Sequence, residues 1–263
     1  MAETDETTLK PRYPTPPRDR AQAWLDANFI GDWYYILPMA TFLVLLFVMS
    51  FDEDVPGLRL AGRVGQLVIV GGLLVWTWKR LTGKERVWSH LPLGVAVGVL
   101  GLVQWVGTDK LLRLGGDWLS WTYFGPVDPL TADDYVAFPE RWGGLVLLVL
   151  AIRLLVSVVV VPVMEEIFWR DFLWRSLISP NDMHDAEVGE YEPIAFFGTA
   201  VAFSFVHPQW LVSIGYGLLM SWLIWRTRSL GSVIVAHAVT NGLLWAYCLV
   251  AWYGFGIDEW YFW

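Results

Sequence analysis

Three short groups of polar side chains interrupt long apolar stretches in the second half of the chain. They are Glu165, Glu166 and Arg170; His207; and His237 with Asn241. Carboxylates and imidazoles take and return protons, and imidazole and amide N–H groups stabilise developing negative charge. Charged side chains inside a bilayer are costly and are candidates for function by default. The residue types therefore predict a site that activates water.

The spacing of the first group separates its two carboxylates. Glu166 and Arg170 are four residues apart with the acid first, the favourable order for an ion pair on one helix face. Glu165 points about 100° away from that face and cannot share the pair equally. An unpaired carboxylate in apolar surroundings suits a general base or acid. The alternative is that both glutamates simply bind Arg170 and Arg175 at the membrane interface.

The second and third groups are less informative when each is taken alone. His207 precedes Pro208, where a helix tends to end, and it could be a hydrogen-bonded packing histidine. His237 and Asn241 share a helix face, and they could equally join two membrane helices. Isolated polar groups would stay unsatisfied in lipid, at a cost of several kcal/mol each. A shared polar cavity avoids this cost, so we expect the three groups to meet.

Apolar blocks of membrane-spanning length must position these residues. Of the 263 residues, 56% are hydrophobic and 17% charged, against about 45–50% and about 25% in soluble domains. Crossing a bilayer takes about 20 helical residues, and seven blocks approach this length: 33–51, 62–78, 90–107, 142–162, 193–206, 209–225 and 231–253. Together with the ambiguous block 163–178, they predict an all-α fold, a polytopic transmembrane bundle of about seven or eight helices.

The blocks follow one another too closely for a second folded domain. We expect a Pro-rich cytoplasmic tail at 1–30 and a single transmembrane domain at 31–263, whose catalytic core spans about 142–250. The tail and the loop 79–86 are basic, which places the N-terminus on the cytoplasmic side of the cell (inner) membrane. The side of the C-terminus depends on whether 163–178 crosses, and both arrangements stay open. A kink at Pro162 or a re-entrant 163–178 is expected, because the candidate residues must lie at one depth.

Charge and cysteine content exclude several classes of function. The chain has 18 Lys and Arg against 26 Asp and Glu, a net charge of −8, which argues against a nucleic-acid partner. The single cysteine, Cys248, permits no internal disulfide and no CxxC metal site, and we interpret it as a packing residue. His90 and His184 are expected to be solvated, and the aromatic loop 108–141 is expected to lie in the membrane interface.

The ordered set EExxxR, FxxxH and HxxxN resembles the signature of CAAX-type intramembrane proteases and their bacterial bacteriocin-processing relatives, the CPBP or Abi family. The matching positions are Glu165-Glu166 and Arg170, Phe203 and His207, and His237 and Asn241. The resemblance covers roughly 142–250, and the first 140 residues carry no matching motif. One departure is Asp171, where the family often has a small residue after the arginine; this leaves the local packing open.

The resemblance implies hydrolysis of a peptide bond in a membrane-associated protein or peptide. The residues matching Glu165 and His207 would activate water, and those matching His237 and Asn241 would stabilise the oxyanion. No cofactor is expected. In a competing scheme a zinc ion activates the water, with Glu165 or Glu166, His207 and His237 as ligands, although no HExxH is present.

Two other functions fit the same residues. The protein could be a catalytically silent scaffold or immunity protein of the membrane, held together by these polar groups. It could instead be a proton-coupled transporter whose Glu and His form a relay. Transporters often carry related broken helices in both halves, whereas every candidate here lies in the second half, which counts against that function.

Overall fold

The computed structural model describes residues 32–49, 51, 58–81, 88–115, 146–180, 182–259 and 262. Within these ranges every regular element is helical and no strand occurs, which confirms the predicted all-α fold class. The expected tail at 1–30 and most of the loop 108–141 lie outside the described residues.

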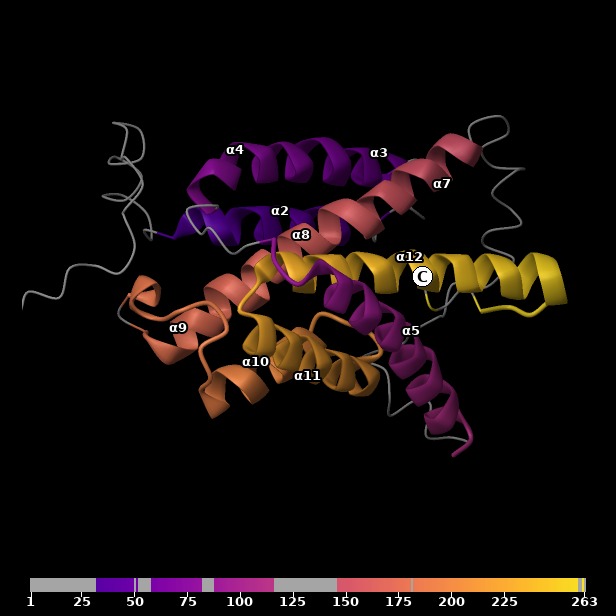
Figure 1. Ribbon diagram of the computed structural model, residues 1–263. Coiled ribbons are helices and arrows are strands. Elements are labelled where there is room, and N and C mark those ends of the chain that lie inside the picture. Colours follow the sequence, from indigo (N-terminus) through magenta and orange to yellow (C-terminus); the bar gives the residue numbers. More distant parts are fainter. Residues whose placement is uncertain are drawn as a thin grey trace, which may run out of the picture.

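Seven long helical runs make up the described part of the chain (Figure 1). They are α2 (Trp33–Met49); α3 (Leu58–Gly65) continued by a π-helical turn and α4 (Gly71–Leu81); α5 (Leu91–Arg113); α7 (Val146–Leu155) continued through α8 (Val161–Glu166) to α9 (Trp174–Ile178); α10 (Pro193–Ser204); α11 (Trp210–Thr227); and α12 (Leu230–Phe255). Three stretches in the described ranges are long and apolar enough to cross a membrane: Leu60–Trp78, Leu91–Arg113 and Leu230–Phe255. The chain is therefore a multi-pass membrane protein.

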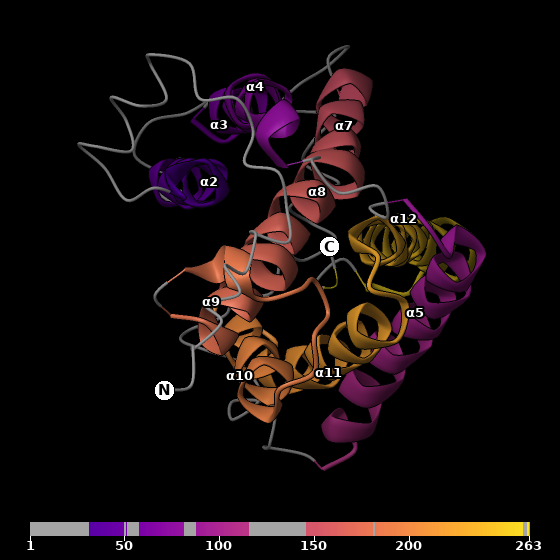
Figure 2. The same cartoon turned by 60° about the vertical axis from the view of Figure 1, so that its left-hand side comes forward.

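The run from α7 to α9 forms the spine of the molecule. Figure 2 shows it between α2–α4 on one side and α5 with α10–α12 on the other. Two π-helical segments interrupt its α-helix, at Val156–Val160 and Ile167–Leu173. The block 163–178 thus continues the preceding helix and is not an eighth helix, because the wide turn before Pro162 lets the helix pass the missing N–H of that proline.

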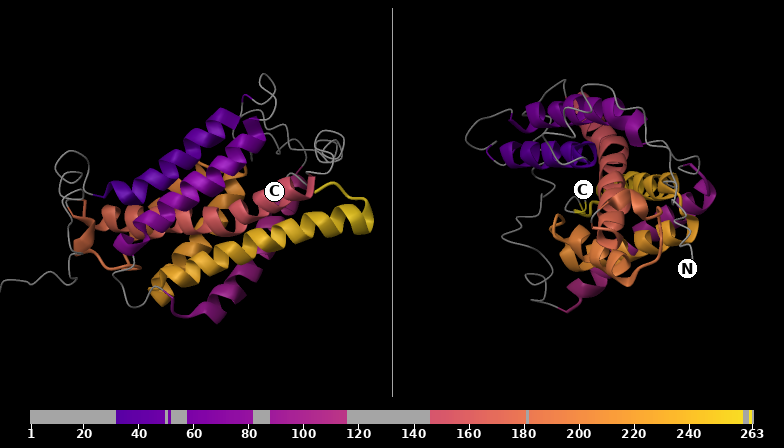
Figure 3. Two further views of the ribbon diagram at one scale, coloured as in Figure 1. Left: turned by 90° about the horizontal axis from the view of Figure 1, so that it is seen from above. Right: turned by 90° about the vertical axis from the view of Figure 1, so that its left-hand side faces the viewer.

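The helices α5 and α12 pack closely against each other (Figure 3). A Cβ atom at Gly94 would lie 2.5 Å from the carbonyl oxygen of Ser232, and one at Gly98 would lie 2.6 Å from that of Ala236. The Thr240 hydroxyl donates a hydrogen bond of 2.9 Å to the Gly98 carbonyl oxygen. Glycines let membrane helices approach to backbone contact, so this contact fixes α5 against the helix that carries the third polar group.

Substitution of Gly98 tests this contact. Gly98→Val should destabilise the fold by about 1–3 kcal/mol or more, because the added methyl groups must displace the α12 backbone. Gly107→Val is the matched control on the same helix, since nothing lies within 4 Å of its added Cβ. Thermal unfolding in detergent should show a lower Tm for the first variant alone. Equal Tm values would mean that α5 does not pack on α12 in this way.

Candidate active site

Glu166 lies at the centre of a buried ion pair. The Arg170 Nε atom is 3.3 Å from Glu166 Oε2, and Arg170 Nη1 donates to Glu166 Oε1 over 3.4 Å. Both side chains are fully buried. The ion pair predicted from the four-residue spacing is therefore confirmed.

His237 binds the same carboxylate from α12. Its Nδ1 atom lies 2.7 Å from Glu166 Oε1. A carboxylate that pairs with Arg170 accepts hydrogen bonds, so Nδ1 carries the proton and Nε2 is left to face other partners. The sequence analysis missed this contact, because no helical periodicity links positions that are 71 residues apart.

Glu165 is not part of this pair. It is buried, and its Oε2 atom makes no hydrogen bond within the described residues. Arg175, the other cation considered for the glutamates, instead binds Asp171, with 2.7 Å between Nη1 and Oδ1, and donates from Nε to the Ala186 carbonyl oxygen. The interpretation in which both glutamates bind Arg170 and Arg175 is therefore wrong. Asp171, the departure from the family pattern, is accommodated by this second buried pair.

His207 follows α10 in the turn that leads to α11. Its Nδ1 atom is 2.9 Å from the Phe203 carbonyl oxygen, and because a carbonyl only accepts, Nδ1 must be the protonated nitrogen. In the neutral ring, Nε2 then carries the lone pair. The Phe203 ring contacts both histidines and the arginine of the site. Its centroid is 4.2 Å from that of His207, 6.3 Å from that of His237 and 4.8 Å from the Arg170 guanidinium carbon.

A buried hydrogen-bonded chain from α5 fixes the turn that carries His207. Trp105 Nε1 donates to Gln209 Oε1 over 2.6 Å, and Gln209 Nε2 donates to Asp109 Oδ1 over 3.2 Å. Arg113 pairs with the same aspartate, and the Trp105 ring packs edge-on against His207 at 5.8 Å. These positions were not predicted, because the apolar block was expected to end at 107, whereas α5 continues to Arg113 and includes Asp109.

Asn241 is oriented by an unusual carbonyl group. Its Nδ2 atom donates to the Ser157 carbonyl oxygen over 2.8 Å. In an α-helix that oxygen would accept from the N–H of Val161, but here this N–H donates to Val156, and Pro162, one residue further on, has no N–H. The π-helical turn and the proline thus leave this carbonyl to the asparagine. Because the carbonyl only accepts, the contact also fixes which way the amide points.

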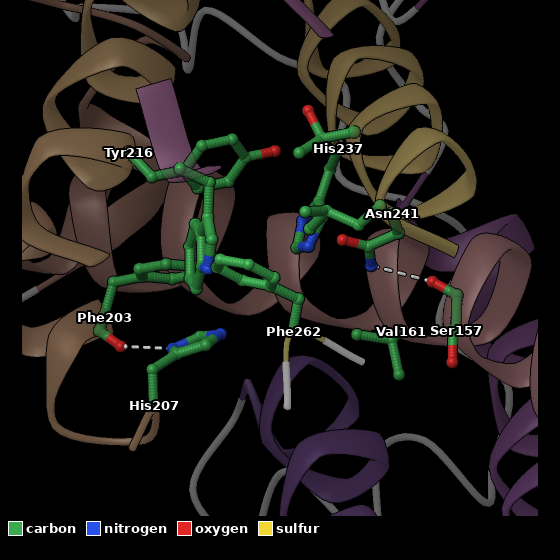
Figure 4. Close-up of a pocket in the computed structure, with 11 residues that line it drawn as sticks. Ser157, Val161, Phe203, His207, Tyr216, His237, Asn241 and Phe262 are labelled. Carbon is green, nitrogen blue, oxygen red and sulfur yellow. Dashed lines mark hydrogen bonds between the residues drawn. The ribbon is translucent and has the colours of Figure 1, made fainter. Parts of the chain in front are cut away.

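A cavity of about 180 Å³ opens between these elements (Figure 4). His207, His237 and Asn241 line it, whereas Glu165 and the Glu166–Arg170 pair are not among its lining residues. The remaining wall is mostly apolar and aromatic, and it consists of Trp105, Ser157, Val161, Phe203, Tyr216, Thr240, Leu244 and Phe262. Three of the six candidate residues therefore face one space, and Glu166 and Arg170 are joined to it through the contact between Glu166 and His237.

The described residues contain no group of three His, Cys, Asp or Glu side chains placed to hold a metal ion. The other histidines lie outside the site: His90 is exposed, and the exposed His184 has Nε2 3.1 Å from Asp32. Cys248 is fully buried, in agreement with a packing role.

The shared carboxylate predicts coupling between Glu166 and Arg170. Arg170→Ala should cost about 3–5 kcal/mol, because it leaves a buried charge without its main partner. Adding Glu166→Gln should recover part of that stability, so the double variant loses less than the sum of the single variants. Chemical unfolding in detergent measures the cycle. The same cycle with Arg175→Ala is the control and should be additive, since Arg175 binds Asp171.

The Ser157 carbonyl predicts a second coupling, between Asn241 and Pro162. Asn241→Leu should cost about 1–3 kcal/mol by leaving the carbonyl unsatisfied. In a Pro162→Ala background the cost should shrink, because the new backbone N–H can take over that acceptor. A Pro193→Ala background, at the first turn of α10, should leave the cost unchanged. An equal loss in all three backgrounds, measured by unfolding, would contradict this account of the amide.

Comparison with known families agrees with the motif set. Residues 147–243 match the family model described as "Type II CAAX prenyl endopeptidase Rce1-like". No curated protein and no solved structure is similar enough to the chain to count as a match. The matched stretch begins in α7, ends in α12 and includes all six candidate residues. The chain therefore carries, at residues 147–243, a domain of the Rce1-like type II CAAX prenyl endopeptidase (CPBP/Abi) family.

Proposed function

We propose that the protein is an intramembrane endopeptidase that hydrolyses a peptide bond of a membrane-associated protein or peptide. One observation carries the proposal. Two histidines of one cavity, His207 and His237, each have Nδ1 held by an acceptor, so that Nε2 of each ring remains for a ligand. In our proposal the protein lies in the cytoplasmic membrane with its N-terminus on the cytoplasmic side, and substrate enters from the bilayer.

The charges of the cluster support different roles for its members. Glu165 interacts electrostatically with Glu166, Arg170 and His237, and two ionised carboxylates outnumber the single guanidinium. An uncompensated buried charge is costly, and in our proposal the reactive state of the cluster carries one further proton, on His237. With the proton on His237, Nε2–H becomes a hydrogen-bond donor and Glu165 remains an ionised base. One proton position thus supplies both an acceptor for the water proton and a donor for the oxyanion.

The reaction then runs in two steps. A water molecule gives one proton to the Glu165–His207 pair, and its oxygen attacks the carbonyl carbon while the carbonyl π electrons move to oxygen. His237 Nε2–H and the second amide hydrogen of Asn241 donate to that oxyanion. The oxyanion collapses, the C–N bond breaks, and the base returns the proton to the leaving nitrogen. Glu165 does not line the cavity, so it must rotate its side chain to take the water proton. No hydrogen bond to Oε2 within the described residues opposes this rotation.

Comparison of new peptide termini in native membranes tests the proposal. Cells lacking the gene are complemented with wild type, Glu165→Gln, His207→Ala or Glu192→Gln, and membrane peptides are identified by mass spectrometry. We expect a cleavage product with wild type and with Glu192→Gln, an exposed glutamate that does not cap its helix. The first two variants should lose the product while the purified proteins keep a normal Tm. Cleavage that survives Glu165→Gln and His207→Ala would overturn the mechanism, and its absence in wild type would favour a silent scaffold.

A further inference from the structure

Tyr216 of α11 presents a further polar group to the same cavity. Its side chain is 1% exposed and lines the cavity opposite α12. Three ring contacts fix its position: its centroid is 5.7 Å from that of His237, 5.4 Å from that of Trp105 and 6.1 Å from that of Phe203. Figure 4 shows the phenol oxygen pointing across the cavity toward α12, from which His237 and Asn241 project.

The only hydroxyl near enough to interact with the buried phenol within the described residues is that of Thr240, and the geometry between the two is not that of a hydrogen bond. The neighbouring Thr240 has its hydroxyl hydrogen engaged by the carbonyl oxygens of Gly98 and Ala236, at 2.9 and 3.0 Å. It can therefore only accept from the phenol. A buried hydroxyl without a bond costs about 1–3 kcal/mol, a penalty that a purely structural residue would avoid as phenylalanine.

A glycine of α5, Gly101, makes room for the Tyr216 ring. A Cβ atom at Gly101 would lie 2.8 Å from Tyr216 Cε2 and 2.5 Å from Thr240 Oγ1. Any larger residue at this position would push the tyrosine and α12 away from α5. The packing that brings α5 close to α12 therefore also seats the Tyr216 ring against the cavity.

We propose that Tyr216 is a catalytic residue whose hydroxyl donates a hydrogen bond to the oxyanion, beside His237 and Asn241; this rests on the proposed function. As the carbonyl π electrons move to oxygen, the phenol O–H points its hydrogen at that atom and keeps its proton. A preorganised donor in a cavity with apolar walls needs no reorganisation when the charge appears. The unsatisfied hydroxyl is thus satisfied in the transition state, which makes its bond selective for that state.

Tyr216→Phe removes the hydroxyl and nothing else. With the peptide identified by the cleavage experiment as substrate, kcat should fall roughly 100-fold, the loss typical for one oxyanion donor, with little change in KM. The Tm in detergent should stay the same or rise, because the substitution removes no hydrogen bond from the folded protein. Tyr191→Phe, at an exposed ring outside the cavity, is the matched control and should leave kcat and Tm unchanged.

Two outcomes would overturn the inference. A lower Tm for Tyr216→Phe with unchanged kcat would mean that the phenol serves the fold, through a bond to Thr240. Unchanged kcat and Tm would mean that the hydroxyl does nothing in the reaction. Wild type and Glu165→Gln in the same assay separate this failure from that of the proposed function, since wild type must cleave and Glu165→Gln must not. Loss of Tm contradicts the proposal even where no cleavage is found.

Discussion

The arrangement of the site depends on one buried carboxylate that serves two cations or donors at once. Glu166 holds Arg170 on its own helix and His237 on α12. Either contact alone would leave a charge poorly compensated in a low-dielectric interior, where breaking a pair is far more costly than forming it is favourable. The carboxylate therefore fixes the spacing between the spine helix and α12, and the cavity lies in the space that this spacing leaves.

Backbone irregularity lets the remaining polar groups converge. A straight α-helix through Pro162 would lose one hydrogen bond, because proline has no N–H to donate to the carbonyl of the preceding turn. Here the π-helical turn at Val156–Val160 moves the loss to the Ser157 carbonyl, and Asn241 satisfies it from a different helix. His207 is positioned by the end of a helix, since it lies in the turn that follows α10. The turn after α10 brings Nδ1 of His207 back to the carbonyl oxygen of Phe203, so the other ring nitrogen, Nε2, points away from that carbonyl.

Sequence reasoning succeeded where one helix decides the outcome. The apolar blocks gave the helices, and the four-residue spacing gave the Glu166–Arg170 pair. It failed where partners come from separate helices, as with Glu166 and His237 or Trp105 and Gln209, because spacing along one helix carries no information about its neighbour. It also took 163–178 for a possible separate helix. Four of the five charged residues in this block pair with each other inside a continuous helix, Glu166 with Arg170 and Asp171 with Arg175.

The family match and the cavity do not cover the same residues. The matched stretch 147–243 holds the groups that can move protons. Three residues that line the cavity come from outside it: Trp105 on α5, Leu244 on α12 and Phe262 beyond α12. Trp105 reaches the site because glycines let α5 approach α12 to backbone contact, and Asp109 holds its partner Gln209 in place. The groups of the proposed reaction thus lie within the matched domain, whereas the shape of the cavity is set in part by residues outside it.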